Sequence, residues 1–138
     1  MIKPKFSGNL KKKTPTSLVK KYYKSNNCII KIQSSFNNTI VTITDILGKT
    51  IFWSSAGTSG FKGAKKGTPY ASQVTSFNVV HKAINFGIQR AEVFIKGSGL
   101  GRDVSLRTFC LNGLTLCFVY DVTKFPHNGC RPPRIRRA

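Results

Sequence analysis

The spacing of apolar residues changes abruptly along this chain, and that change limits the fold more than any other feature. Residues 28–45 read CIIKIQSSFNNTIVTITD, where two β-branched runs flank a turn whose asparagines suit positive φ, as in a β-hairpin. Residues 68–89 instead place apolar side chains every three or four positions, which is the period of an amphipathic α-helix. A chain that carries both periods predicts an α/β fold.

The helical stretch also carries signals for its two ends. Thr68 suits the N-cap, Pro69 suits the first helical position and Gly87 suits the C-terminal end. The helix is therefore expected to begin just after Thr68 and to end at Gly87. Its expected apolar face consists of Tyr70, Val74, Phe77, Val80, Ile84 and Ile88.

Three further strands and a second helix complete the expected order. Residues 49–56 and 91–96 have the composition of strands, and residues 114–121 have that of a final buried strand. Between the last two strands, residues 97–113 form a glycine loop that enters a helix ending at an Asn-Gly pair. An initial hairpin followed by strands separated by helices predicts one domain with a mixed β-sheet and helices packed on it. We expect Trp53 and the other strand aromatics to pack in the core.

The charge balance indicates a polyanionic partner. The chain has 23 Lys and Arg against four Asp and Glu, and its net charge of +19 would repel itself strongly unless a polyanion neutralised it. Nucleic acid is therefore the expected partner. The sequence has no apolar run of about 18 residues and no basic amphipathic helix, so we expect no membrane association. We also expect neither export nor a cleaved import signal of the usual kind.

Composition divides the chain into three parts. Residues 1–26 hold eight lysines and no acid, which predicts a basic N-terminal extension. Residues 27–121 hold the expected strands and helices and are predicted to form an RNA-binding body. Residues 122–138 form a basic tail rich in Pro and Arg. Its prolines stiffen an extended backbone, and its arginines suit bidentate contacts with phosphate or stacking on bases.

Three segments of the body carry groups suited to RNA. The loop GTSGFKGAKKG sets lysines among glycines, so backbone can approach a ribose-phosphate chain closely while ammonium groups neutralise it. Phe61 in this loop can stack on a base or fill a gap in the core. The hairpin tip SFNN offers amides that can donate to phosphates or base edges. The later glycine loop offers N–H groups at a helix start, and Arg102 adds a charged fork, although the same glycines can simply make a tight turn.

The sequence offers no set of catalytic or metal-binding residues. Gly97, Gly99 and Gly101 give G-x-G-x-G, whereas the dinucleotide-binding fingerprint needs G-x-G-x-x-G. The four acids lie in four separate segments, and the four cysteines form no CxxC pair. We therefore expect no enzyme, no cofactor and no metal. The cysteines are expected to be reduced thiols in the core, apart from Cys130, whose arginine neighbours can lower its pKa.

Four stretches of the sequence resemble one known family. SFNNTIVTITD, WSSAGTSGFKGAKKGTPYASQ, AEVFIKGSGLGRD and DVTKFPHNGCRPPRIRRA are similar to the small-subunit ribosomal protein eleven family of the bacterial and organellar type, and the likeness runs in unbroken order from about residue 28 to residue 138. The resemblance implies a fold similar to ribonuclease H without its catalytic acids. It also implies a structural role on the platform of the small ribosomal subunit, near the messenger RNA exit path. The implied partners are central-domain rRNA and neighbouring platform proteins.

The residue chemistry and the resemblance together define the expected RNA contacts. In this family the basic loop and the tail reach rRNA. The hairpin tip and Arg102 are also expected to contact RNA, because their amide and guanidinium groups can donate hydrogen bonds to phosphates. The expected contact residues are Phe36, Asn37, Asn38, Lys62, Lys65, Lys66, Arg102, Lys124, His127, Asn128, Arg131, Arg134, Arg136 and Arg137.

Two alternatives stay open at this point. A free-standing single-strand or architectural nucleic-acid binder is the competing class of protein. For the compartment, many Ile, Phe and Asn residues and a preference for Lys over Arg suggest an AT-rich organellar gene. We expect a mitochondrial ribosome, with the plastid second and a bacterial cytoplasm third.

Overall fold

The computed structural model describes residues 27–137, so the predicted basic extension, residues 1–26, lies outside the described residues, as does Ala138. The described part is an α/β structure, which confirms the expected fold class. Its elements are β1 (Asn27–Ser34), β2 (Thr39–Thr44), β3 (Thr50–Ser55), the short 3-10 helix η1 (Gly63–Gly67), α2 (Pro69–Phe86), β4 (Arg90–Lys96), α3 (Gly101–Leu111) and β5 (Thr115–Asp121).

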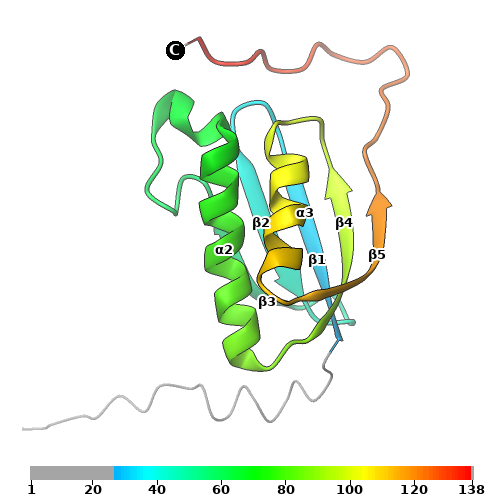
Figure 1. Cartoon of the computed structure of the whole chain (residues 1–138). Helices are drawn as coiled ribbons and strands as arrows, with labels where there is room; N and C mark the ends of the chain where they lie inside the picture. The colour runs from blue at the N-terminus through cyan, green and yellow to red at the C-terminus, as the bar shows by residue number, and fades with distance from the viewer. Residues whose placement is uncertain (1–26, 138) are drawn as a thin grey trace, which may run out of the picture.

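The five strands form one mixed sheet in the order β3-β2-β1-β4-β5. β1 pairs with β2, and β2 with β3, in antiparallel fashion, whereas β1 pairs with β4, and β4 with β5, in parallel. The two parallel connections run through α2 and α3, and both helices lie on the same face of the sheet (Figure 1). This arrangement confirms the predicted mixed sheet with helices packed on it, and it agrees with the ribonuclease H-like topology implied by the resemblance.

The ends of α2 are those that its sequence predicts. The hydroxyl of Thr68 accepts a hydrogen bond from the backbone N–H of Ala71 at 3.3 Å, and Pro69 occupies the first helical position. At the other end Gly87 adopts the left-handed conformation with φ of 97°, and its N–H donates to the carbonyl oxygen of Ile84 at 2.9 Å.

The predicted buried face of α2 is wrong. Of its expected members only Val80 and Ile88 are buried, while Tyr70, Phe77 and Ile84 point to solvent. The face that packs on the sheet and on α3 is made mainly of small residues: Ala71, Ser72, Thr75, Ser76, Val79, Val80 and Ala83. The close approach of α3 explains this choice, because a Cβ added at Gly101 would clash with the Ser72 hydroxyl. Large side chains therefore have no room between the helices.

The prediction of a buried final strand is also wrong. β5 lies at one edge of the sheet, and its residues are almost all exposed. Trp53, which we expected in the core, is 56% exposed on β3 at the other edge. The helices cover one face of the sheet, so the apolar core forms on that face and mainly between the central strands and the helices. Its largest fully buried side chains include Phe109, Ile30, Ile32, Ile43, Ile95, Val41, Val79 and Val93.

The cysteines divide into one buried thiol and three exposed ones. Cys28 packs in the core, where burial, aided by the negative charge of Asp45, raises the pKa of its thiol to about 12. Cys110, Cys117 and Cys130 are exposed. The prediction of core thiols is thus wrong for Cys110 and Cys117, because the outer face of α3 and the edge strand β5 lie outside the core. Within residues 27–137 no helix is long and apolar enough to cross a membrane.

Candidate nucleic-acid interface

The predicted RNA-contact residues come from segments that meet at one end of the sheet. Because β1, β4 and β5 are parallel, their carboxyl ends lie at the same end, together with the β1–β2 hairpin tip. The basic loop and the starts of α2 and α3 lie there as well, and the tail runs across this end of the molecule (Figure 1). We call this region the basic end.

The hairpin tip is closed by a serine rather than by asparagines in the left-handed region. The Ser35 N–H donates to the Asn38 carbonyl oxygen at 2.9 Å, and the Ser35 hydroxyl accepts from the Asn38 N–H at 3.1 Å. The Asn38 side chain accepts from the N–H of Thr39 at 3.0 Å. The hairpin prediction is therefore confirmed, but the positive φ is not, because Asn128 is the only described residue other than glycine with positive φ.

Asn37 holds the tail at the hairpin tip. Its Nδ2 donates to the carbonyl oxygen of Arg134 at 2.9 Å, and its Oδ1 accepts from the N–H of Arg136 at 2.8 Å. The Asn37 side-chain amide thus donates to and accepts from the tail backbone, as the backbone of a neighbouring strand would. The side chains of Arg134 and Arg136 stay exposed to solvent. The structure assigns Asn37 a tail-positioning role that its sequence context did not indicate.

A groove separates the tail from the body beside this clamp. It has a volume of about 440 Å³, and its walls come from the hairpin tip, from Lys96, Gly97 and Ser98, and from the tail prolines Pro132 and Pro133. The prolines restrict the tail backbone to an extended conformation, so the tail forms one wall of the groove.

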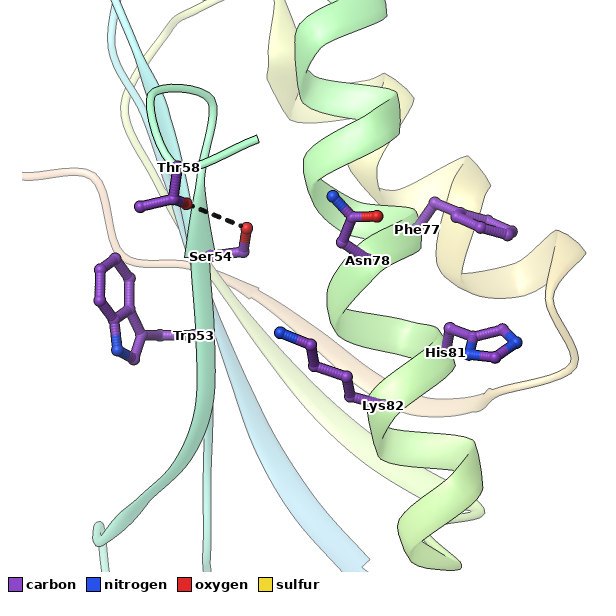
Figure 2. A pocket seen from close by; sticks show the side chains of 7 residues that line it. All are labelled: Trp53, Ser54, Thr58, Phe77, Asn78, His81 and Lys82. Atoms are coloured by element: carbon purple, nitrogen blue, oxygen red, sulfur yellow. Dashed lines mark hydrogen bonds between the residues drawn. The ribbon is translucent and has the colours of Figure 1, made fainter. Parts of the chain in front are cut away.

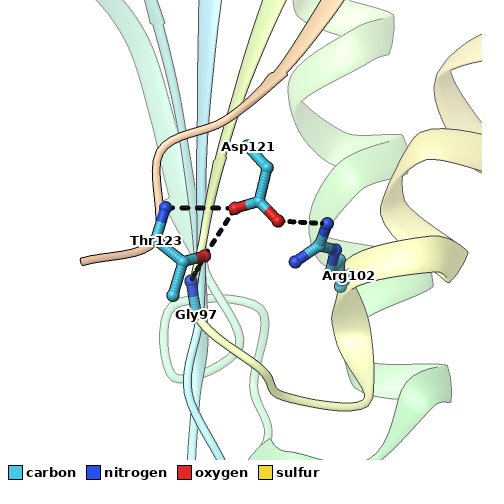
Figure 3. A network of polar contacts seen from close by, with 4 residues as sticks. All are labelled: Gly97, Arg102, Asp121 and Thr123. Carbon is cyan, nitrogen blue, oxygen red and sulfur yellow. Dashed lines mark hydrogen bonds and ion pairs between the residues drawn. The ribbon is translucent and has the colours of Figure 1, made fainter. Parts of the chain in front are cut away.

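A second set of contacts holds the root of the tail (Figure 3). Oδ1 of Asp121 accepts from the N–H of Thr123 at 3.0 Å and from its hydroxyl at 2.6 Å, while Oδ2 accepts from Nη2 of Arg102 at 2.7 Å. The Gly97 N–H donates to the Thr123 hydroxyl at 3.1 Å. The hydrogen bonds from Thr123, followed by the one from Arg102, lower the pKa of Asp121 to about 2.

Asp121 and Thr123 are positioning residues that sequence reasoning missed. The signal was present, because an aspartate followed two positions later by threonine at a strand end can form a local side-chain turn. Arg102 shares its guanidinium with Asp121 through a salt bridge. Contact between Arg102 and RNA stays a prediction. The salt bridge to Asp121 already orients the Arg102 side chain.

The glycines before α3 serve close packing against the hairpin. Gly97 has a φ of 102°, and a Cβ added there would clash with the carbonyl oxygen of Ser34; one added at Gly99 would clash with that of Ser35. The Gly99 N–H donates to the Ser34 carbonyl at 3.1 Å. Two N–H groups of this loop, those of Gly97 and Gly99, thus bond to the protein itself, so the loop is first of all a tight connection.

The basic loop packs against the hairpin from the other side. A Cβ added at Gly67 would meet the carbonyl oxygen of Phe36, so the end of η1 touches the hairpin tip closely. Lys62 and Lys65 are exposed and Lys66 is half-buried. Phe61 packs edge-on against Tyr70, with ring centroids 5.9 Å apart, and so fills a gap beside α2.

The tail itself presents its cations without acidic partners. In the described part of the tail, Lys124, Arg131, Arg134, Arg136 and Arg137 are all exposed and none forms a salt bridge. His127 and Asn128 lie at the bend of the tail, where Asn128 has a φ of 60°. The structure therefore gathers the predicted contact residues at one end, with free charge on the tail and the loop.

A further hollow lies between β3 and α2 (Figure 2), and its lining includes Trp53 of β3 and Thr58 of the basic loop. It has a volume of about 670 Å³, and its lining residues, among them His81 and Lys82, include no acid. Nδ1 of His81 is hydrogen-bonded to the side-chain Nδ2 of Asn85 at 3.1 Å. Over residues 27–137, no three His, Cys, Asp or Glu side chains gather as a metal site would require. This hollow offers no paired acid and base for catalysis.

Comparison with known proteins agrees with the resemblance. The model of the family described as Ribosomal protein S11 matches residues 28–137. The relatives include the Small ribosomal subunit protein uS11c of Phalaenopsis aphrodite subsp. formosana, 59% identical over 110 residues, and that of Atropa belladonna, 58% identical over 110 residues. The protein of the same name from Lemna minor is 59% identical over 110 residues. Each alignment covers 80% of this chain and 80% of the relative.

Proposed function

The chain belongs to the ribosomal protein S11 family and is a structural constituent of the small ribosomal subunit, and from this premise we propose that it binds the rRNA of that subunit through its basic end. It is a structural protein rather than an enzyme, and it serves translation as part of the ribosome. The observation that carries the proposal is the tail, which is held at Thr123 and at Asn37 while its arginines remain exposed.

We assign the contacts by their chemistry. Arg131, Arg134, Arg136 and Arg137 bind phosphates in bidentate fashion, because their backbone is already ordered and their guanidinium groups are free. Lys62, Lys65 and Lys66 neutralise a ribose-phosphate chain that passes over the loop. The remaining proposed contacts are Phe36, Asn38, Arg102, Lys124, His127 and Asn128.

Asn37 has a different role in this proposal from the one its sequence suggests. Its amide is already bonded to the tail, so it acts on RNA through the position of Arg134 and Arg136. The same holds for Asp121, which directs Arg102 and fixes the root of the tail. The functional division proposed for the chain is a basic extension (1–26), a body (27–121) and an RNA-binding tail (122–138).

The finer location follows from the family resemblance. We place the protein on the platform of the subunit, on central-domain rRNA, beside other platform proteins and close to the path of messenger RNA. As a ribosomal protein it acts in the ribosome, and for the compartment we propose the plastid. The support is that the relatives above carry the chloroplast form of the name, uS11c, which favours the plastid over the mitochondrion that composition suggested.

The test compares two full-length variants that lose the same charge. Arg134→Ala/Arg136→Ala/Arg137→Ala removes three cations from the tail but keeps the backbone that Asn37 binds. Lys49→Ala/Lys82→Ala/Arg107→Ala removes three exposed cations that lie away from the basic end. We expect the first variant to co-sediment with small subunits much less than the wild type, and the second to co-sediment as the wild type does. Equal behaviour of the two variants would refute the assignment to the basic end.

A further inference from the structure

The sheet has a second face that no element of the described chain covers. Both helices lie on the opposite side (Figure 1), and the strand register lines up one row of side chains across this uncovered face. The pairs Trp53–Thr42, Thr42–Lys31, Lys31–Phe94 and Phe94–Tyr120 run from β3 to β5. Four inter-strand spacings of about 4.8 Å give this row a length of about 19 Å. We call this surface the open face.

The open face carries aromatic rings that do not serve the core. Phe94 and Tyr120 stack with centroids 5.0 Å apart and an angle of 24°, and Phe118 stacks beside Tyr120 at 6.1 Å. Phe118 is 58% exposed and Tyr120 is 43% exposed. At the other end of the row, the Trp53 side chain points away from α2 (Figure 2). Rings left this open usually mark a surface that another molecule covers.

The charge of the open face is positive. Alternation along β4 buries Ala91, Val93 and Ile95 under the helices and so directs Arg90, Glu92, Phe94 and Lys96 outward. With Lys31 of β1 this gives three cations against one acid. A hollow of about 380 Å³ lies in this face, and its lining includes Lys31, Phe94 and Lys96.

We propose that the open face binds single-stranded RNA, whose bases stack on Phe118, Tyr120 and Trp53 while Lys31 and Lys96 contact its phosphates. Exposed aromatics on a sheet flanked by cations are the combination that single-stranded nucleic acid requires, since every base offers a π-face and every linkage a charge. Duplex RNA does not fit, because its bases are already stacked on one another. This site is additional to the basic end and does not depend on it.

Charge argues against the other occupants. The first 26 residues carry eight lysines and no acid, and a second copy of the chain brings the same net charge of +19, so a cationic surface repels both. An apolar protein segment would cover the rings but would leave Lys31 and Lys96 without anionic partners. An RNA strand satisfies the rings and the cations together.

The single tryptophan of the chain gives a direct readout, because Trp53 lies in the row. The experiment titrates the full-length protein with an oligouridine of about ten nucleotides and follows Trp53 fluorescence, with an RNA duplex of the same length for comparison. We expect saturable quenching by the single strand and much weaker quenching by the duplex. Equal quenching by the two would mean that charge alone attracts RNA, and it would overturn the proposal.

Two variants separate stacking from apolar docking and from charge. Phe118→Leu/Tyr120→Leu keeps apolar, strand-compatible side chains but removes two rings, so we expect affinity for the oligouridine to fall roughly fivefold or more. Lys31→Gln should weaken binding of the oligouridine and make the slope of log K against log salt shallower by about 0.7, the contribution of one phosphate contact. Phe77→Leu is the matched control, because this exposed ring lies on α2, outside the open face and outside the proposed RNA contacts. Thermal unfolding confirms that each variant is folded.

The outcomes also distinguish this site from the proposed function. If the leucine pair binds oligouridine as tightly as the wild type does, stacking on Phe118 and Tyr120 is refuted and the open-face proposal is overturned. If the tail variant Arg134→Ala/Arg136→Ala/Arg137→Ala abolishes quenching while the leucine pair keeps it, the strand binds at the basic end and the open-face proposal is overturned. If the tail variant retains both quenching and small-subunit association, the open-face site stands and the assignment of rRNA binding to the tail fails.

Discussion

The side chain of Asn37 accepts a hydrogen bond at 2.8 Å from the backbone N–H of Arg136, a residue 99 positions further along the chain. Together with the bond from Asn37 to the Arg134 carbonyl, this contact holds the basic tail in an extended path across one end of the sheet. The basic tail is thus held at both ends, by Asn37 and by Thr123, before any RNA is bound. Ordering in advance lowers the conformational entropy that the proposed contacts between the arginines and phosphates would cost.

Substitution of Asn37 by alanine should release the tail. The variant loses both hydrogen bonds, each worth about 1 kcal/mol, so hydrogen exchange at the Arg136 amide should accelerate by roughly fivefold or more. Asn37→Asp keeps the acceptor for Arg136 and loses the donor to Arg134, so it should give an intermediate rate. Asn85→Ala, on the exposed side of α2, is the control. An Arg136 amide that exchanges equally fast in the wild type and in Asn37→Ala would contradict the clamp.

The carboxyl group of Asp121 should titrate far below its ordinary range. Its pKa is about 2 in the folded protein, against the ordinary value of 3.8, because of the hydrogen bonds from Thr123 and Arg102. A lowered pKa means that this contribution to stability is present above about pH 3.8 and is lost as the pH falls through about 2.

The Thr123→Val variant tests that cause. It removes the hydroxyl donor and keeps the backbone N–H, so the pKa of Asp121 should rise toward 3.8, as measured by carboxyl-carbon NMR. A wild-type pKa already near 3.8 would show that the network of Figure 3 does not form in solution.

The thiols should react in two classes. Cys28 has a pKa of about 12 and is buried, so it should resist alkylation at about pH 8, while the exposed Cys110, Cys117 and Cys130 should be labelled. Because the folded pKa is raised above the ordinary value of 9.0, the stability linked to Cys28 is complete below about pH 9 and declines as the pH rises toward 12. Mass spectrometry of the labelled protein, native and in urea, measures the difference. Labelling of Cys28 at the rate of Cys110 would refute its place in the core.

Gly101→Ala should destabilise the protein. The added Cβ would clash with the hydroxyls of Ser72 and Thr39, which hydrogen-bond to each other at 2.7 Å, and such overpacking costs about 1–3 kcal/mol. Gly57→Ala is the matched control, because its Cβ would make only ordinary contacts and its φ is not positive. The free energy of unfolding in urea gives the comparison. Equal stability of the two variants would show that α2 and α3 can separate at little cost.

The parts of the fold that the sequence predicts are those with local causes. Thr68 and Gly87 define the ends of α2 through contacts within a few residues, and the hairpin follows from two adjacent runs of apolar residues. The inward face of α2 could not be predicted in the same way. Phe77 has the right spacing for a core residue, but the glycine at position 101, on another helix, leaves room only for small side chains.

In the candidate site, too, the features with local causes could be predicted, and the contacts between distant segments could not. The sequence indicates which residues are basic and exposed, because charge and flanking Gly or Pro are local properties. It does not indicate that Asn37 would be occupied by the tail, since the two segments are separated by almost the whole body. Asp121 with Thr123 is a local motif that could have been recognised, whereas its bond to Arg102 depends on the parallel pairing of β4 and β5.

The most direct test of the central claim is the salt dependence of binding between the full-length protein and a transcript of small-subunit rRNA. Each phosphate neutralised contributes a slope of about −0.7 to −0.9 in log K against log salt, so docking through the tail and the loop predicts a slope of about −3 or steeper. The tail variant Arg134→Ala/Arg136→Ala/Arg137→Ala should give a shallower slope, and the charge-matched control Lys49→Ala/Lys82→Ala/Arg107→Ala should keep that of the wild type. A wild-type slope shallower than about −3, or an equal loss of slope in both variants, would contradict an RNA interface built on the basic end.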